Sequence, residues 1–210
     1  MPSSSNWSSV VGGQVTSTGV YYAVAVSATS GTVNAYSAVT NFGGNVTMNN
    51  FTAGSALPST ALWTSIAYGV APDPTTGALT GYWVAVAGSG AGTGGQTAYT
   101  TNPTGSWTSG GTLPGVLASG TSYNNQISFG SNGVWVVVGS VAGTRATAAA
   151  YSTNNGISWT AITLPISAYW TKALYAQEHA SWTAISGDAT NFSANTAISV
   201  ATAGLAVPHT

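Results

Sequence analysis

The chain has 210 residues and a formal net charge of −1, because it contains only two Lys or Arg and three Asp or Glu residues. Its hydrophobic content of 44%, with 8 Trp, 10 Tyr and 4 Phe, indicates a folded core and argues against disorder. So few basic residues exclude nucleic acid as a partner, no apolar run is long enough for membrane insertion, and the absence of Cys excludes disulfides.

The first predicted strand covers residues 6–11, Asn-Trp-Ser-Ser-Val-Val. The first of four copies of one phrase follows at residues 13–58. It contains Tyr22 at the start of a Val/Ala-rich run, then Tyr36 before a Ser, and it ends at Pro58. Short runs rich in Val, Tyr and Thr between Gly, Asn, Ser and Pro clusters are typical of strands and turns.

The same three landmarks recur in copies at about residues 63–114, 122–165 and 170–208. The prolines that end the four copies lie 56, 51 and 43 residues apart, so the last copy is short. A repeat of this length that contains only strand and turn signals predicts blades or arrays. The recurring residues are Trp83, Trp135 and Trp182 near the start of the Val/Ala runs, Tyr99 and Tyr151, and Pro114, Pro165 and Pro208.

The third copy is the clearest and predicts four strands, at about 126–129, 134–138, 147–152 and 157–163. Asn-Gly pairs, at 132–133 and 155–156, separate adjacent strands. Asn and Gly are favoured in two-residue hairpin turns because both positions need a positive φ. Each copy is therefore expected to form one antiparallel sheet.

The last copy offers strands near 171–177, 181–186 and 196–201 and no fourth one. The strand at 6–11 resembles the fourth strand of the third copy, so we expect it to complete the last blade. The sequence predicts one all-β domain over residues 1–210, a four-bladed β-propeller closed by its N-terminal strand. A half-propeller that dimerises into a larger ring remains an alternative.

Residues 152–159, Ser-Thr-Asn-Asn-Gly-Ile-Ser-Trp, resemble the Asp-box, or bacterial neuraminidase repeat, with the pattern Ser-x-Asp-x-Gly-x-x-Trp. Asn154 replaces the Asp, and residues 100–107 form a partial second match. The resemblance implies a propeller in which the box lies between outer strands, away from any catalytic centre. The group includes sialidases and non-catalytic phage and secreted proteins. Arg145 is the only arginine, whereas sialidase-like catalysis needs a cluster.

The remaining ionisable residues predict no catalytic, metal or cofactor site. Glycoside hydrolysis needs two carboxylates that face one bond. Asp73 is expected to be a turn residue, and Glu178 and Asp188 are expected to be solvated loop carboxylates. A zinc site needs at least three protein ligands, and His179 and His209 have no evident third partner.

The aromatic residues divide into a recurring set and an irregular set. Recurring aromatics are expected in the blade cores, because a packed repeat needs the same filling in every copy. Irregular ones are better candidates for contacts with a partner. The recurring set is Trp83, Trp107, Trp135 and Trp159, and the irregular set is Phe42, Phe51, Tyr169, Trp170 and Phe192.

The absence of an evident catalytic set favours recognition or assembly. We expect a non-enzymatic structural protein of a virus particle, a bacteriophage capsid-decorating or tail-associated protein. It would act through contacts with other virion proteins or copies of itself, and would be made in the host cytoplasm without a signal peptide. A net charge near zero favours such association. The alternative is a glycan-binding module, such as a receptor-binding tip, since Tyr, Trp, Ser and Asn suit sugar surfaces.

Overall fold

The computed structural model describes residues 5–29, 31–42, 45–88, 94–118, 123–141, 145–187 and 198–201. The expectation of an all-β chain is confirmed, because these residues form four antiparallel sheets. The only helical turns among them are two short 3₁₀ segments, η1 (Gly115–Ala118) and η2 (Gln177–His179). Within the described ranges, no helix is long and apolar enough to cross a membrane.

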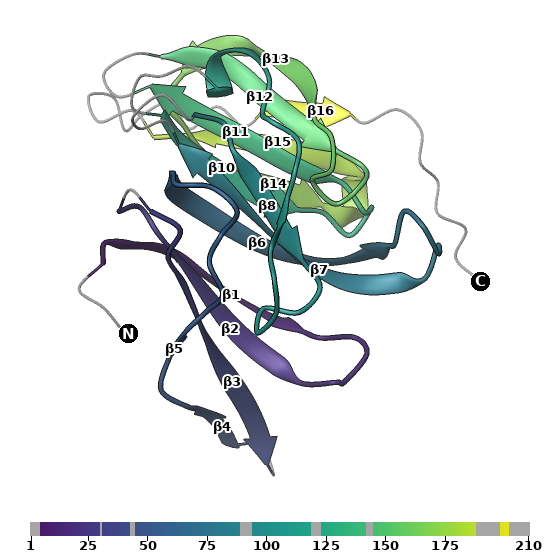
Figure 1. The fold of residues 1–210 in the computed structure, drawn as a ribbon. Helices are drawn as coiled ribbons and strands as arrows, with labels where there is room; N and C mark the ends of the chain where they lie inside the picture. Colours follow the sequence, from purple (N-terminus) through teal and green to yellow (C-terminus); the bar gives the residue numbers. More distant parts are fainter. Residues whose placement is uncertain are drawn as a thin grey trace.

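Each sheet is built from strands that follow one another in the chain (Figure 1). The first sheet contains β1 (Trp7–Gln14), β2 (Tyr21–Ser27), β3 (Asn34–Phe42), β4 (Asn45–Met48) and β5 (Thr52–Ala53). The second contains β6 (Leu62–Pro72), β7 (Leu79–Gly88), β8 (Thr97–Thr100) and β9 (Thr108–Ser109). The third contains β10 (Tyr123–Phe129), β11 (Trp135–Val141), β12 (Ala146–Ser152) and β13 (Thr160–Ala168). The fourth contains β14 (Trp170–Ala176), β15 (Ser181–Ser186) and β16 (Ile198–Ala201).

The N-terminal strand does not complete the last sheet, and that prediction was wrong. β1 pairs with β2 from Trp7 to Gln14 and is the first strand of the first sheet. β1 runs through Gly12 and Gly13 to a turn in which Val15 N–H donates to the Val20 carbonyl. Gly13 serves packing, because a Cβ there would collide with the ring of Tyr68.

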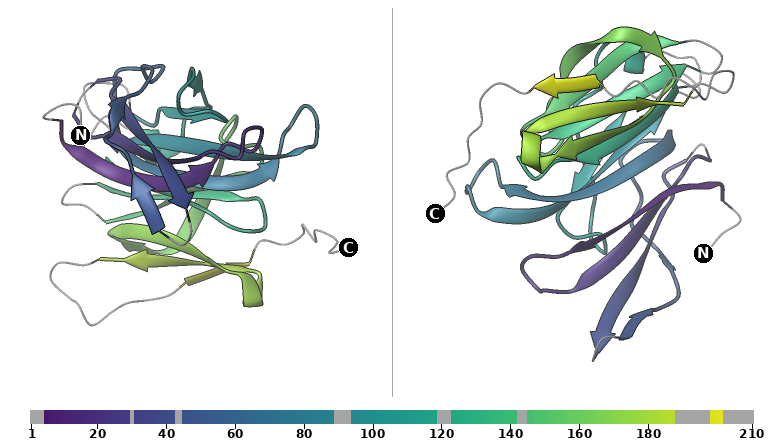
Figure 2. Two further views of the ribbon diagram at one scale, coloured as in Figure 1. Left: turned by 90° about the horizontal axis from the view of Figure 1, so that it is seen from below. Right: turned by 180° about the vertical axis from the view of Figure 1, so that it is seen from behind.

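The sheets lie side by side in chain order, and the first strand of each contacts the first strand of the next. β1 contacts β6, β6 contacts β10, and β10 contacts β14, while no comparable contact joins the described parts of β14 and β1. The left view of Figure 2 places the first and fourth sheets at opposite ends of the row. The described sheets therefore form three interfaces and leave two end faces, one on the first sheet and one on the fourth, that no other described sheet covers.

An apolar cluster fills each of the three interfaces. The second strands contribute more residues to these clusters than any other set of strands, which agrees with their Val/Ala-rich sequences. Trp83, Trp135 and Trp182 are buried, each beside an aromatic of the preceding strand, with ring centroids 4.7, 4.5 and 5.3 Å apart. In strand register the first sheet has Ala23 at this position, so the prediction that Tyr22 matches these tryptophans was wrong by one residue.

The turns of the third sheet differ from the prediction in two places. Asn155 and Gly156 both have positive φ, at 60° and 83°, whereas at the other Asn-Gly pair only Gly133 does. The last strand of this sheet starts at Thr160, not at residue 157, because the Asn155-Gly156 turn occupies a longer loop. It also continues through Pro165, which lacks an N–H and lies where the pairing with β12 is irregular.

Candidate functional site

An open groove of about 350 Å³ lies where the first strands of all four sheets meet. Its size suits a small ligand. Each of the four strands contributes three or four consecutive residues, so residues far apart in the sequence share one surface. The lining residues are Ser9, Val10 and Val11 of β1, Ile66, Ala67 and Tyr68 of β6, Ile127, Ser128 and Phe129 of β10, and Lys172, Ala173, Leu174 and Tyr175 of β14.

Bulges position the polar groups of the strands that line the groove. The pairing register of the first strand shifts after Trp7, Trp63 and Trp170. A bulge leaves backbone groups out of the ladder, where they can bond to a neighbouring sheet. Ser9 Oγ accepts a hydrogen bond from Ile66 N–H at 3.3 Å. The repeated Trp-Ser/Thr dipeptide was the sequence signal for this feature, and the sequence prediction missed it.

The same bonds recur between the second and third sheets. Ser65 Oγ accepts a hydrogen bond from Ile127 N–H at 3.3 Å, as Ser9 does one sheet earlier. The bulge hydroxyls also donate forward, from Ser8 to the Trp63 carbonyl at 2.6 Å and from Thr64 to the Asn125 carbonyl at 2.7 Å. These bonds set how each first strand lies against the next.

Aromatic rings on three of the first strands rest against glycines of the preceding sheet. Space for a Cβ is missing at Gly13 because of the Tyr68 ring, and at Gly69 because of the Phe129 ring. Gly130 is likewise covered by the rings of Tyr175 and Trp182. Only glycine lets the ring approach the backbone so closely. The rings of Tyr68, Phe129 and Tyr175 thus border the groove in fixed positions.

Lys172 is the only residue with a charged side chain among those that line the groove. Its Nζ donates to the Ile127 carbonyl at 3.4 Å, and burial lowers the pKa of the ammonium. Ser128 is only 7% exposed, and its Oγ has no hydrogen-bond partner in the structure. A buried hydroxyl without a partner is costly and is a group that a bound ligand can satisfy.

Asp73 lies at the turn between β6 and β7, as expected, and not on the groove. Its Oδ1 accepts hydrogen bonds from Thr75 N–H and Thr76 N–H at 2.9 and 2.8 Å, and its Oδ2 accepts one from the Tyr82 hydroxyl at 2.6 Å. The Tyr82 bond, followed by the backbone bonds, lowers the pKa of Asp73 to about 2. Burial, together with the Asp73 carboxylate, raises the pKa of Tyr82.

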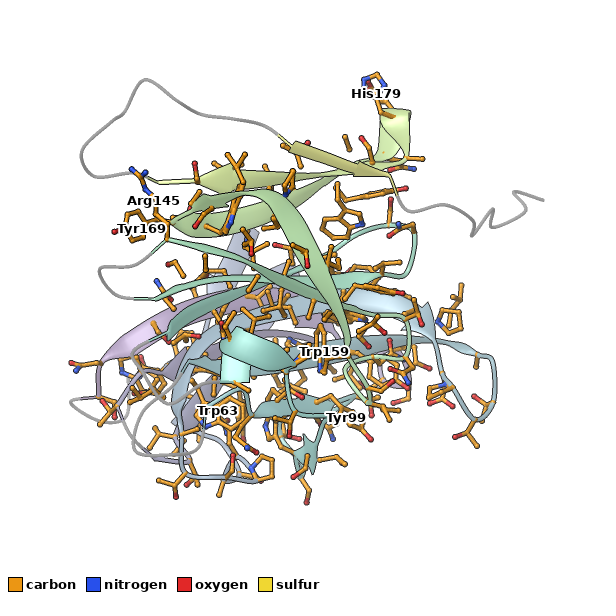
Figure 3. The ribbon with its side chains drawn as sticks, turned by 90° about the horizontal axis from the view of Figure 1, so that it is seen from above. Trp63, Tyr99, Arg145, Trp159, Tyr169 and His179 are labelled. Atoms are coloured by element: carbon orange, nitrogen blue, oxygen red, sulfur yellow. The ribbon has the colours of Figure 1, made fainter. Side chains whose placement is uncertain are left out.

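The other ionisable candidates do not converge on one place. Glu178 and His179 are exposed on η2, and Asp188 and His209 lie outside the described residues. The Arg145 guanidinium lies 6.0 Å from the centre of the Tyr169 ring, and Figure 3 shows the two side chains together, far from His179. Among the described residues, no three His, Cys, Asp or Glu side chains gather to hold a metal ion.

The aromatic expectations were correct in part. Trp83, Trp107 and Trp135 are buried, and Trp159 is half-buried against the second interface. Trp170 is only 1% exposed and donates its indole N–H to the Ala146 carbonyl, so it is not available as an external contact. Tyr169 and Phe51 are half-buried, Phe42 ends β3 and its side chain is outside the description, and Phe192 lies outside the described residues.

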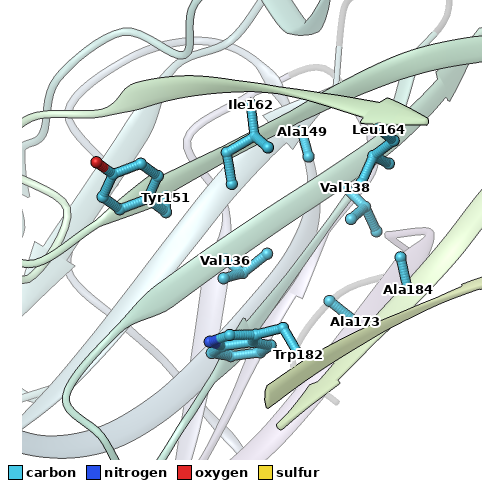
Figure 4. A pocket seen from close by; sticks show the side chains of 9 residues that line it. All are labelled: Val136, Val138, Ala149, Tyr151, Ile162, Leu164, Ala173, Trp182 and Ala184. Atoms are coloured by element: carbon cyan, nitrogen blue, oxygen red, sulfur yellow. The ribbon is translucent and has the colours of Figure 1, made fainter. Parts of the chain in front are cut away.

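A second cavity, of about 20 Å³, lies inside the third interface (Figure 4). Apolar side chains line it, among them Val136, Leu164 and Trp182. It is about large enough for one water molecule but offers that water almost no polar partner. This cavity belongs to the core and is not a candidate site.

Comparison with protein-family models and with curated proteins gave no match to this chain.

Proposed function

We propose that this chain is a non-enzymatic structural protein of a virus particle, a bacteriophage capsid-decorating or tail-associated protein that acts through protein–protein contacts. In this proposal the four sheets are blades of a β-propeller of the Asp-box type. The described ionisable side chains do not gather in one place. The groove, to which all four sheets contribute, is lined by uncharged side chains apart from Lys172.

One observation carries the proposal: both end faces of the row of sheets expose apolar side chains on a nearly uncharged protein. Val10 on β1 is 58% exposed and Leu174 on β14 is 49% exposed. Like charges that would keep copies apart in solution are almost absent, because the whole chain has five charged side chains. Such a surface suits a protein whose faces are covered by neighbours in an assembly.

Quantitative mass spectrometry of purified virus particles from the source of the chain tests this proposal. The expected result is that the protein is present at a copy number fixed by the symmetry of the particle. If purified particles contain none of it while it accumulates elsewhere, the proposal is wrong.

The groove favours a second candidate function, glycan binding. The half-buried rings of Tyr68, Phe129 and Tyr175 border it, and Ser128 adds an unpaired hydroxyl. Aromatic faces with nearby hydroxyl groups suit sugars. A glycan array that can detect millimolar affinities tests this function. We expect Ser128→Ala to weaken any binding without reducing stability, because its hydroxyl has no partner to lose; an array without any binding contradicts it.

A further inference from the structure

We propose that the end face of the fourth sheet binds the end face of the first sheet of a second copy of this chain, head to tail. The contact would repeat the interface that joins neighbouring sheets within the chain. This inference rests on the proposed function as an assembly protein and names the partner.

Strand register makes the four sheets directly comparable. Ser9, Ser65, Gln126 and Lys172 pair with Val26, Val86, Val138 and Ile185, and therefore hold equivalent positions. The next residue faces the preceding sheet: Ile66, Ile127 and Ala173 are 4%, 0% and 1% exposed there. The equivalent residue of the first sheet, Val10, is 58% exposed because the structure places no sheet before it.

The opposite end of the row lacks the other half of the same interface. The residue after these positions faces the following sheet, and Ala67 and Ser128 are buried there. Leu174, the equivalent on the fourth sheet, is 49% exposed. Within the chain, Val11 packs with Ile66, and Ala67 packs with Ile127. Leu174 and Val10 are the corresponding pair; each is exposed, and both border the groove between β14 and β1.

The buried indole N–H of Trp7 also lacks a hydrogen-bond acceptor in the structure. Trp63 Nε1 donates to the Gly31 carbonyl, between β2 and β3, at 3.2 Å and to the Ser59 carbonyl at 3.3 Å, and Trp170 Nε1 donates to the Ala146 carbonyl of the preceding sheet at 2.8 Å. Trp7 holds the same position in the first sheet, and its Nε1 is buried without a hydrogen-bond partner in the structure. A preceding sheet would supply the missing acceptor.

Two positions at which the sheets differ from one another indicate which face fits against the fourth sheet. Gly13, Gly69 and Gly130 each accept an aromatic ring of the next sheet, but the fourth sheet has Ala176 at this position. A methyl group there would obstruct an incoming ring.

The first sheet is the one that has no aromatic side chain at the position from which the other sheets insert a ring. Gly12 takes the place of Tyr68, Phe129 and Tyr175, and Ala23 takes the place of the paired tryptophans. A Cβ at Gly12 would meet nothing within 4 Å. The fourth sheet has no glycine to receive a ring, and the first sheet has no ring at the equivalent position to insert. The first-sheet face therefore fits against the fourth sheet.

A second copy supplies this face because the chain's own first sheet lies at the other end of the row. The groove separates β1 from β14; ring-on-glycine contacts restrict the angle at all three interfaces, and bulge bonds do so at the first two. Head-to-tail contacts of this kind close into a ring or continue as a filament. Two copies joined twice would cover all four end faces.

Cysteine cross-linking tests the contact, since the natural chain has no Cys. Val10→Cys and Leu174→Cys are prepared as separate proteins, then oxidised alone and as a mixture. We expect a cross-linked dimer in the mixture and none in either protein alone. Leu79→Cys, which changes a residue that is 66% exposed and lies on β7, away from both end faces, is the matched control and should not cross-link with either.

Three results would overturn the inference. Dimers of either single variant alone would indicate a symmetric contact of one face with itself. A Val10→Cys/Leu174→Cys double variant that forms its bond within one chain at high dilution would indicate closure of the chain on itself. A wild-type mass of 20.8 kDa by light scattering at all concentrations would indicate no contact between copies.

A charged variant gives an independent readout that does not depend on disulfide geometry. We expect Leu174→Asp to shift the solution mass from a multiple of 20.8 kDa to 20.8 kDa, while Leu79→Asp leaves the multiple unchanged. Both positions are exposed, so the fold should tolerate either change. The mass spectrometry of particles remains a separate test: a protein found in particles but always monomeric in solution keeps the proposed function and loses this inference.

Discussion

Asp73 is a half-buried turn residue whose carboxylate organises the connection between β6 and β7. It accepts backbone bonds from Thr75 and Thr76 and a short bond from Tyr82, which is buried at the second interface. The carboxylate thereby ties a loop to the apolar core. Asn155, with φ of 60°, completes this region by donating to the Pro72 carbonyl at 3.0 Å and accepting from Trp135 Nε1 at 3.2 Å.

The low pKa of Asp73 predicts an acid-sensitive contribution to stability. Its pKa falls from an ordinary value of 3.8 to about 2 on folding, so its ionised form stabilises the fold above the ordinary value. The contribution is lost as the pH falls toward 2. We expect Asp73→Asn to be less stable than the wild type in urea unfolding at pH 7 and the difference to shrink toward pH 2. An equal difference at both pH values would contradict this role.

The glycines beneath the aromatic rings predict a second effect at single residues. Gly69→Ala places a methyl group against the Phe129 ring, and overpacking of this kind costs about 1–3 kcal/mol. Urea unfolding of the purified variant measures it. Gly105→Ala is the control, because its nearest atom would be the Asn102 carbonyl at an ordinary 3.5 Å. Equal stability of the two variants would mean that the ring does not need the glycine.

At the scale of elements, the loop between β12 and β13 shows what Asn154 does at the position where the Asp-box pattern that this sequence resembles has an Asp. Asn154 Oδ1 accepts a hydrogen bond from Ser158 N–H at 3.0 Å, as a carboxylate could, and its Nδ2 adds a bond to Ser158 Oγ at 2.9 Å. Ser152 Oγ accepts from Gly156 N–H at 3.0 Å. Trp159 then leaves the loop, and its indole N–H reaches Thr97 of the second sheet at 3.4 Å.

This loop yields a prediction that separates its two polar positions. Ser152 is only 1% exposed, so Ser152→Ala leaves buried N–H groups without an acceptor and should cost about 1–3 kcal/mol in thermal or urea unfolding. Asn154→Asp keeps the Oδ1 acceptor and should change stability by less than about 0.5 kcal/mol, as is usual for surface substitutions. The reverse order of the two effects would show that Asn154 is the essential group.

The strands and their order were largely predictable from the sequence, because Val/Ala runs and Asn-Gly turns report local structure directly. The strands at 134–138, 147–152 and 181–186 were placed to within a few residues of β11, β12 and β15. The N-terminal strand was misassigned because residues 6–11 resemble the fourth strand of the third copy, and such a local resemblance does not determine the pairing partner, which is β2. The groove was not predicted, since it depends on contacts between residues about 55 positions apart, such as Ser9 and Ile66.

At the scale of the whole molecule, the scarcity of charge predicts how assembly responds to salt. The end faces present Val10, Leu174 and backbone, with Lys172 as the one nearby charge. Salt weakens contacts between exposed charges and has little effect on apolar ones. We expect the solution mass, measured by light scattering, to be unchanged between about 0.05 and 1 M NaCl. Dissociation at the higher salt concentration would indicate that ion pairs hold the copies together.

Ala176 stands where the other three sheets have a glycine, and this difference also limits how the repeat can grow by gene duplication. A further copy of the second, third or fourth sheet, added after the fourth, would bring an aromatic ring against the Ala176 methyl group, where the earlier sheets offer a glycine. A lengthened chain would therefore need a second mutation, Ala176→Gly, before the new sheet could dock. Gly12 and Ala176 thus distinguish the two end sheets from the two sheets between them.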